Sequence, residues 1–163
     1  MASRVSPAVL VIGLGNPLRG DDAAGIMVVR RLRQRAAARV LEQSGEATAL
    51  VDALRDASAA LIVDAASGTQ PGRVRRLDAA AQPLPQGLFG CSTHGFGVAE
   101  GIELARALGA LPPVCVVYAL EGVQFETGAA MSPAVQAAVP GVAARIEAEI
   151  DALQPGRMGV ADA

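Results

Sequence analysis

Continuous apolar runs alternate along this chain with stretches in which apolar residues recur at helical spacing. The runs at 8–14, 60–64 and 114–120 are typical of strands buried on both faces of a parallel sheet. A further short strand is expected near 39–43. Over 72–79, apolar and basic residues alternate, which predicts an edge or half-exposed strand.

Four helices are expected between and after these strands. In the first, Ile26, Val29 and Leu32 form an apolar stripe, and arginines gather near the C-terminal end, where they favour the helix dipole. The last helix begins at Ser132, with Pro133 at the first helical position. Strands that alternate with helices imply a mostly parallel sheet covered on both faces. The expected helices span 23–38, 51–57, 97–108 and 132–153, with a loop rich in Pro, Gln and Gly at 80–90.

The composition fits a single domain that binds neither membrane nor nucleic acid. The 163 residues are about one domain's length, and 52% are hydrophobic but only 2% aromatic. No apolar run approaches the roughly 20 residues that span a bilayer, and the first residues lack the apolar stretch of a signal peptide, so we expect a cytoplasmic protein. A net charge of −2 argues against a nucleic-acid partner. We expect an ordered core at about 7–153 and a frayed tail at 154–163.

The segment VIGLGNPLRGDDAAG (11–25) joins an apolar strand to a tight glycine turn that ends in two carboxylates, Asp21 and Asp22. In an open α/β sheet, chemistry is found just beyond the carboxyl ends of the strands, where these residues are expected. An aspartate at a helix start also caps backbone N–H groups, so one of the two is expected to act mainly as a cap. Capping does not account for a second, adjacent acid.

Two further segments carry polar groups at the ends of elements. LIVDAASG (61–68) is a strand that ends on Asp64, and CSTHGFG (91–97) is a polar loop that holds His94, the only histidine of the chain. With the aspartates of the first segment, these residues can form a three-ligand metal site or a hydrogen-bonded acid/base cluster. Cys91 is close enough in sequence for a nucleophilic Cys–His pair, but we interpret it as a small loop residue.

The glycine turn has two other interpretations. The glycines of 13–15 could begin a dinucleotide-binding fingerprint, but Leu18 stands where its third glycine belongs, and a pyrophosphate would meet two aspartates at the helix start. GLGNP (13–17) also opens peptidyl-tRNA hydrolases. That family continues with a tyrosine and an Arg-His-Asn element that carries its catalytic histidine, and residues 18–25 contain neither.

The chain resembles the [NiFe]-hydrogenase maturation proteases, the endopeptidases that trim the precursor of the hydrogenase large subunit. The resemblance rests on three blocks, GLGNPLRGDDAAG, LIVDAASG and STHGFGVAEGIELARALG, and on a weaker fourth, LEGVQFETGAAMSPAVQAAV. They stand in the family's order from Val11 to about Val139. The resemblance implies one three-layer α/β/α domain, in which a twisted, mostly parallel sheet of about five strands lies between helices. It also implies removal of a short C-terminal extension of the precursor after nickel insertion.

Carried over residue by residue, the family's metal-binding and catalytic positions fall on Asp22, Asp64 and His94. Two oxygen ligands and one nitrogen ligand suit nickel, and three protein ligands leave coordination positions open. The resemblance thus implies an aspartic-type, metal-dependent endopeptidase that recognises nickel supplied by the precursor, with zinc or cadmium as substitutes in vitro. The expected partner is the precursor, and the protein is expected to act as a monomer. Asp21 is then a cap or support of the turn, and Asp21→Asn is expected to cost little stability.

Two other functions stay open at this level. A non-catalytic module that senses the metal of a metalloenzyme precursor would need the same three residues, and cleavage of a nickel-loaded precursor would separate it from a protease. Hydrolysis of a small ester or amide, as by a peptidyl-tRNA-hydrolase-like esterase, is opposed by the absence of a G-x-S-x-G nucleophile elbow.

Overall fold

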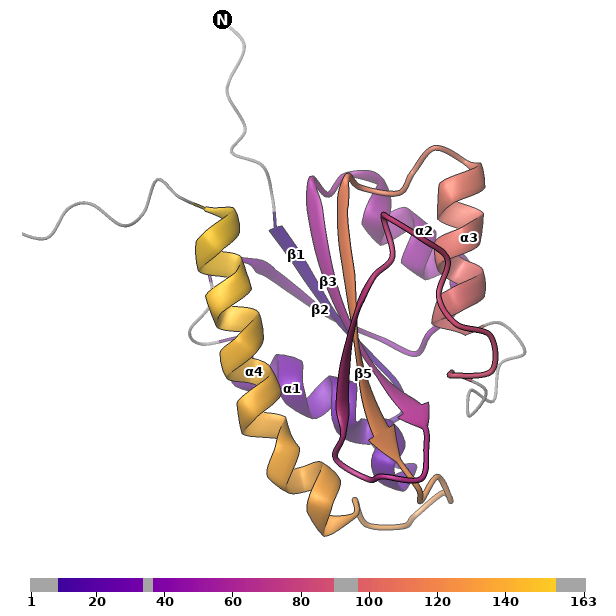
Figure 1. Cartoon of the computed structure of the whole chain (residues 1–163), viewed down its shortest axis with the longest axis vertical. Coiled ribbons are helices and arrows are strands. Elements are labelled where there is room, and N and C mark those ends of the chain that lie inside the picture. The colour runs from indigo at the N-terminus through magenta and orange to yellow at the C-terminus, as the bar shows by residue number, and fades with distance from the viewer. Residues whose placement is uncertain (1–8, 34–36, 90–96, 155–163) are drawn as a thin grey trace, which may run out of the picture.

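Five strands form one sheet in the computed structural model, which describes residues 9–33, 37–89 and 97–154. The strand order is β2-β1-β3-β5-β4, and every neighbouring pair is parallel except the antiparallel pair of β4 and β5 (Figure 1). The edge position of β4 confirms the half-exposed strand expected over 72–79. The strands are β1 (Val9–Leu14), β2 (Arg39–Gln43), β3 (Ala59–Ser67), β4 (Val74–Asp78) and β5 (Val114–Gly122).

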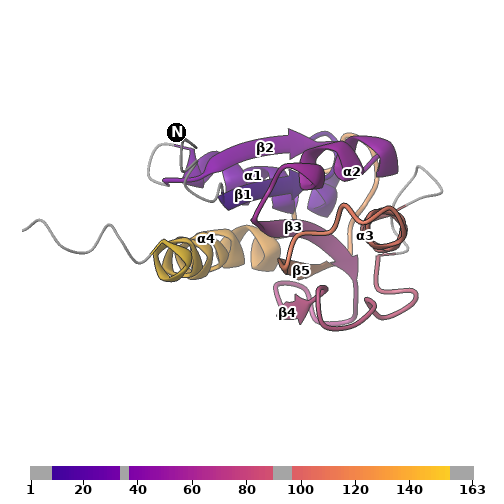
Figure 2. The same ribbon diagram turned by 90° about the horizontal axis from the view of Figure 1, so that it is seen from above.

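Helices cover both faces of this sheet, as Figures 1 and 2 show. Helices α1 and α4 pack on one face, and α2 and α3 pack on the other, which confirms the three-layer α/β/α architecture. A short 3₁₀ helix, η1, leads directly into α1. Within the described ranges, no helix is both long and apolar enough to cross a membrane. The helices are η1 (Gly20–Ala23), α1 (Ala24–Leu32), α2 (Ala47–Arg55), α3 (Val98–Ala107) and α4 (Pro133–Leu153).

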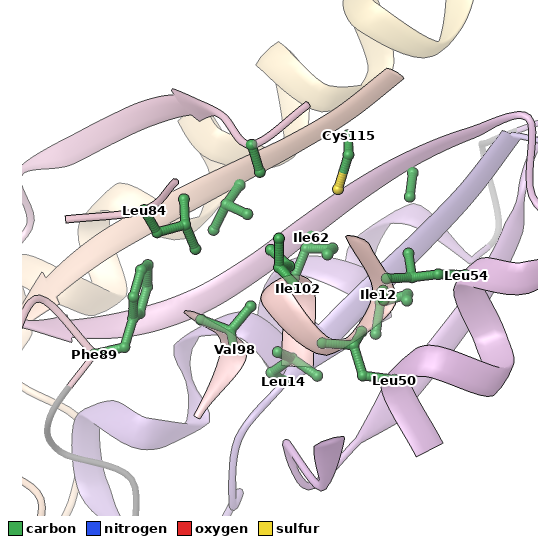
Figure 3. Close-up of a cluster of buried hydrophobic side chains, with 14 of the residues drawn as sticks. Ile12, Leu14, Leu50, Leu54, Ile62, Leu84, Phe89, Val98, Ile102 and Cys115 are labelled. Carbon is green, nitrogen blue, oxygen red and sulfur yellow. The ribbon is translucent and has the colours of Figure 1, made fainter. Parts of the chain in front are cut away.

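Successive residues of the buried strands point to opposite faces of the sheet, so each face has its own aliphatic core. In β3, Ala60 and Ile62 belong to the core beneath α2 and α3, which Figure 3 shows. Leu61 and Val63 belong to the core beneath α1 and α4. Asp64 follows Ala60 and Ile62 at every second position of β3, so its side chain points to the same face of the sheet, the one covered by α2 and α3.

The connections create a switch point between β1 and β3. From β1 the chain runs through α1, on one face, to β2, and then returns through α2, on the other face, to β3. The two strands are paired in parallel, with Gly13 beside Val63. In open α/β sheets, ligands bind in the crevice outside the carboxyl ends of the strands at such a point.

Some element bounds differ from the sequence expectation. The helix expected over 23–38 is preceded by η1, and α1 ends at Leu32. Helix α2 begins at Ala47, four residues before the expected start, and its first turn already contains a fully buried core residue, Leu50. The expectation that the strand at 60–64 ends on Asp64 is wrong, because backbone pairing of β3 with β5 continues to Ser67 and Asp64 lies inside the strand.

Candidate functional site

The turn after β1 fixes the position of Asp22. Gly15 has φ +136°, and a Cβ on this residue would overlap the backbone carbonyl oxygen of Asp22. Glycine is therefore required where the turn folds back onto η1. The Asp22 carboxylate accepts a hydrogen bond from the backbone N–H of Asn16 at 2.9 Å, and the Arg19 guanidinium lies 3.4 Å from the same oxygen, Oδ2. These contacts hold Asp22, which is only 7% exposed, in one orientation at the end of β1.

A close approach of α1 to the sheet brings this turn beside β3. A Cβ on Gly25, in the first turn of α1, would overlap the carbonyl oxygen of Val63, the residue before Asp64. The absence of a side chain at Gly25 lets the start of α1 lie directly on the ends of β1 and β3. The helix start that carries Asp22 therefore meets the end of β3.

Asp64 is half-buried near the end of β3 and interacts electrostatically with Asp22. Loss of contact with water raises the pKa of the Asp64 carboxyl well above its usual value, and the negative charge of Asp22 raises it further. A backbone hydrogen bond at Ala65 opposes these effects. The structure thus brings together two of the three predicted site residues. Such a pair of carboxylates can hold a cation between them or share a proton.

His94 lies outside the described residues, as does Cys91, so the third predicted ligand stays a prediction. Among the residues that the structure does describe, no group of three or more His, Cys, Asp or Glu side chains could hold a metal ion. The residues that bracket the histidine-containing segment, Phe89 and Gly97, are both buried and line one cavity.

This cavity, of about 660 Å³, opens between the loop after β4 and the first turns of α3. It lies on the α2/α3 side of the sheet, the side on which the Asp64 side chain stands. A hydrogen bond from the Ser67 N–H to the Leu88 carbonyl, 3.0 Å long, joins the end of β3 to this loop. The cavity is lined by Pro83, Leu84, Pro85, Gln86, Gly87, Phe89, Gly97, Ala99, Glu100 and Glu103.

Asp21 differs completely from its neighbour. Its carboxylate is fully buried and accepts hydrogen bonds from the N–H groups of Val123 (2.9 Å), Gln124 (3.0 Å) and Ser132 (2.7 Å), and from the Ser132 hydroxyl (2.8 Å). Burial alone would raise the pKa of Asp21, but these four hydrogen bonds outweigh it and lower the pKa. Asp21 therefore connects η1 to the loop after β5 and to the start of α4.

The expectation that Asp21 acts as a cap of its own helix is wrong. Its hydrogen-bond partners lie 102 to 111 positions further along the chain, and neither η1 nor α1 has a side-chain cap. Since all four partners are donors, an asparagine amide at this position would leave at least one of them without an acceptor, so we now expect Asp21→Asn to cost more stability than the sequence alone suggested. A local sequence pattern carries no signal for contacts of such separation.

Glu121 is a buried carboxylate that the sequence pattern did not single out. It lies near the carboxyl end of β5 and is 5% exposed. Its Oε2 accepts a hydrogen bond from the Gln70 N–H at 3.3 Å, and its Oε1 lies 3.8 Å from the Arg73 guanidinium. Glu121 thus holds the β3–β4 connection against β5, and it supports the edge of the sheet from the side opposite Asp21.

Fold and site together define an open α/β/α protein with a pair of carboxylates at the switch point of its sheet. The sequence model of the hydrogenase maturation protease family matches residues 26–149, which include Asp64 and His94 and begin just after Asp22. The chain belongs to the hydrogenase maturation protease family.

Curated relatives include the hydrogenase expression/formation proteins HupD of Thiocapsa roseopersicina and Bradyrhizobium diazoefficiens. The first is 27% identical over 139 residues, which cover 82% of this chain and 63% of the relative. The second is 28% identical over 134 residues, which cover 78% of this chain and 70% of the relative. The chain thus spans somewhat less than two thirds of the Thiocapsa protein.

Solved structures of the same fold include two maturation proteases. The hydrogenase maturating endopeptidase HybD from E. coli superposes with a TM-score of 0.73 at 22% identity, over 91% of this chain and 94% of that one. The [NiFe] hydrogenase maturation protease HycI from Thermococcus kodakarensis gives a TM-score of 0.69 at 20% identity, over 90% and 94%. At these identities the likeness confirms the α/β fold.

Proposed function

We propose that this protein is an endopeptidase that removes the C-terminal extension of a [NiFe]-hydrogenase large-subunit precursor after nickel insertion. The observation that carries the proposal is the convergence of Asp22 and Asp64 at the switch point of a chain of this family. The cavity on the same side of the sheet as the Asp64 side chain offers space for part of a polypeptide substrate.

In this proposal nickel belongs to the substrate and is held by Asp22, Asp64 and His94. The two carboxylates lie close enough to interact electrostatically, and a cation between them would relieve their repulsion. Two carboxylate oxygens and one imidazole nitrogen suit nickel, and zinc or cadmium could replace it in vitro. An incomplete ligand set on the protease leaves coordination positions for the precursor's own groups.

The same pair of carboxylates could supply the acid/base chemistry of an aspartic-type endopeptidase. A carboxyl whose pKa is raised is a better general acid than an ordinary aspartate, and a neighbouring ionised carboxylate can accept a proton. We further propose that the protease acts as a monomer in the cytoplasm, where it meets the folded, nickel-loaded precursor.

The experiment that tests this function is cleavage of a purified precursor in two forms, nickel-loaded and nickel-free. Mass spectrometry of the products should show a shortened precursor only when nickel is present in it. Asp64→Asn should abolish cleavage, with the fold preserved by circular dichroism. Equal cleavage of both precursor forms would contradict the recognition of nickel. Tight binding of the loaded precursor without any cleavage would favour the non-catalytic, metal-sensing module.

A further inference from the structure

Two loops that are joined by backbone hydrogen bonds beside Asp21 carry three apolar residues, here called the apolar rim: Leu18 in the turn after β1, and Val123 and Phe125 in the loop after β5. Leu18 is 69% exposed and Val123 is 54% exposed, and Phe125 is half-buried. Aromatic side chains are scarce here, with three phenylalanines and one tyrosine in 163 residues. Exposed apolar groups that gather beside a polar site are typical of surfaces that bind a partner.

The backbone of the rim is held firmly even though its side chains are exposed. The Leu18 N–H donates to Asn16 Oδ1 at 2.9 Å, and the Leu18 carbonyl accepts from the Gly128 N–H at 2.7 Å. The Val123 N–H donates to the Asp21 carboxylate at 2.9 Å. A partner that meets this rim would therefore not have to order it, which reduces the entropic cost of binding.

Asp21 places the rim directly beside Asp22. The Asp21 N–H donates to the Gln124 carbonyl at 2.7 Å, so the turn after β1 and the loop after β5 are joined next to Asp22. A Cβ on Gly122 would lie 2.6 Å from the Asp21 Cβ and 3.1 Å from the tip of the Phe125 ring. The ring therefore packs over Gly122, against the residue that adjoins Asp22.

We propose that the apolar rim binds apolar side chains of the precursor's polypeptide next to the bond that is cut. This inference rests on the proposed function, since the site beside the rim must then hold a polypeptide in place. Three side chains fall far short of the area of a stable dimer interface, which buries about 1,200 Å² or more. A short extended segment, in contrast, can be held by two or three such contacts, which contribute to the affinity for the precursor and so to KM.

The test replaces the exposed side chains without changes to the backbone that carries them. In the double variant Leu18→Gln/Val123→Thr, the KM for the nickel-loaded precursor should rise about tenfold, while kcat stays within about twofold. The midpoint of thermal unfolding should stay unchanged, because both side chains are exposed. The matched control is Leu108→Gln, at the C-terminal end of α3, where Leu108 is 55% exposed. Its KM should equal that of the wild type.

Direct binding of the precursor, measured by fluorescence anisotropy, keeps this inference separate from the proposed function. If the wild type binds the precursor and the double variant binds it about tenfold more weakly, the rim is a docking surface even if no cleavage occurs. In that case only the proposed function fails. If the wild type and the double variant had equal KM and bound the precursor equally, the proposal that the rim binds the precursor would be wrong. A change in self-association of the double variant, measured by sedimentation, would also contradict the proposal, because it would show that the rim contacts a second copy of the chain.

Discussion

Asp21 and Asp22 are adjacent and chemically identical, yet their surroundings give them different roles. Asp21 is fully buried, with both carboxylate oxygens occupied by four donors from the loop after β5 and the start of α4. Asp22 is slightly exposed and lies close enough to Asp64 to raise its pKa. One aspartate therefore connects segments of the fold, and the other takes part in the site.

The substitution of each aspartate by asparagine should separate these roles. Asp21→Asn places an amide N–H₂ where an oxygen now accepts hydrogen bonds, so at least one buried donor loses its partner. The free energy of unfolding should fall by about 2 to 4 kcal/mol, measured by urea denaturation. Asp22→Asn should change stability by less than about 1 kcal/mol and abolish precursor cleavage, because the charge is lost while the shape is kept.

A larger stability loss for Asp22→Asn than for Asp21→Asn would contradict this assignment. Retention of cleavage by Asp22→Asn would exclude Asp22 from the site. The exposed acid Asp52 offers a control, since Asp52→Asn lies on α2 and should affect neither measurement.

At the scale of elements, a polar cluster joins β4, β5 and α4 on the face opposite the cavity. The buried Tyr118 hydroxyl donates to Glu149, and the Arg76 guanidinium donates to the same carboxylate, with its Nε at 2.9 Å. The Arg145 guanidinium lies 5.3 Å from the centre of the Tyr118 ring. Burial, the hydrogen bond and the charge of Glu149 raise the pKa of Tyr118 to about 12, although Arg76 opposes the shift.

This shift predicts a loss of stability at alkaline pH that depends on Tyr118. In the unfolded chain the Tyr118 hydroxyl titrates near pH 10. The stability that the folded state gains from the raised pKa of Tyr118 is therefore complete below pH 10 and is lost as the pH rises towards about 12. Between these values the free energy of unfolding of the wild type should fall by about 2 kcal/mol more than that of Tyr118→Phe. Denaturation curves at pH 9 to 12 test this. If the free energy of unfolding fell equally with pH in the wild type and in Tyr118→Phe, a raised pKa at Tyr118 would be contradicted.

At the scale of the whole molecule, the proposed ligands come from three segments that only the folded chain brings together. Asp22 follows β1, Asp64 lies in β3, and His94 stands between β4 and α3 in the sequence. A metal ion that binds all three therefore binds the folded state alone. Such binding stabilises the fold by mass action.

Addition of nickel to the free protein should accordingly raise its unfolding temperature. At a nickel concentration of about 100 times Kd, the stabilisation should be about 2.7 kcal/mol, and it should disappear with excess chelator. It should also fade below about pH 6.5, as His94 becomes protonated. His94→Gln and Asp64→Asn should each remove most of the shift in thermal unfolding. An equal nickel response in His94→Gln would show that the ligand set is wrong.

The layered fold and the approach of two candidate carboxylates could be predicted from the sequence alone. Buried strands and amphipathic helices differ in period, so the apolar pattern predicts both, and carboxyl ends of parallel strands share one edge of the sheet. The residues after β1 and those in the C-terminal half of β3 could therefore be expected to lie close together, and the electrostatic interaction of Asp22 with Asp64 agrees with this. Strand β4 at the edge was likewise predictable from its alternation of apolar and basic residues.

Contacts between segments that are distant in sequence could not be predicted from the local pattern. The partners of Asp21 lie more than 100 positions away, so no helix-start rule could separate a buried connecting residue from a cap. The packing of Gly25 on Val63, the burial of Glu121 and the raised pKa of Asp64 likewise depend on elements that are distant in sequence. Desolvation and close charges act over a few ångströms in space. Such distances are set by how the layers pack, and the order of residues along the chain does not fix them.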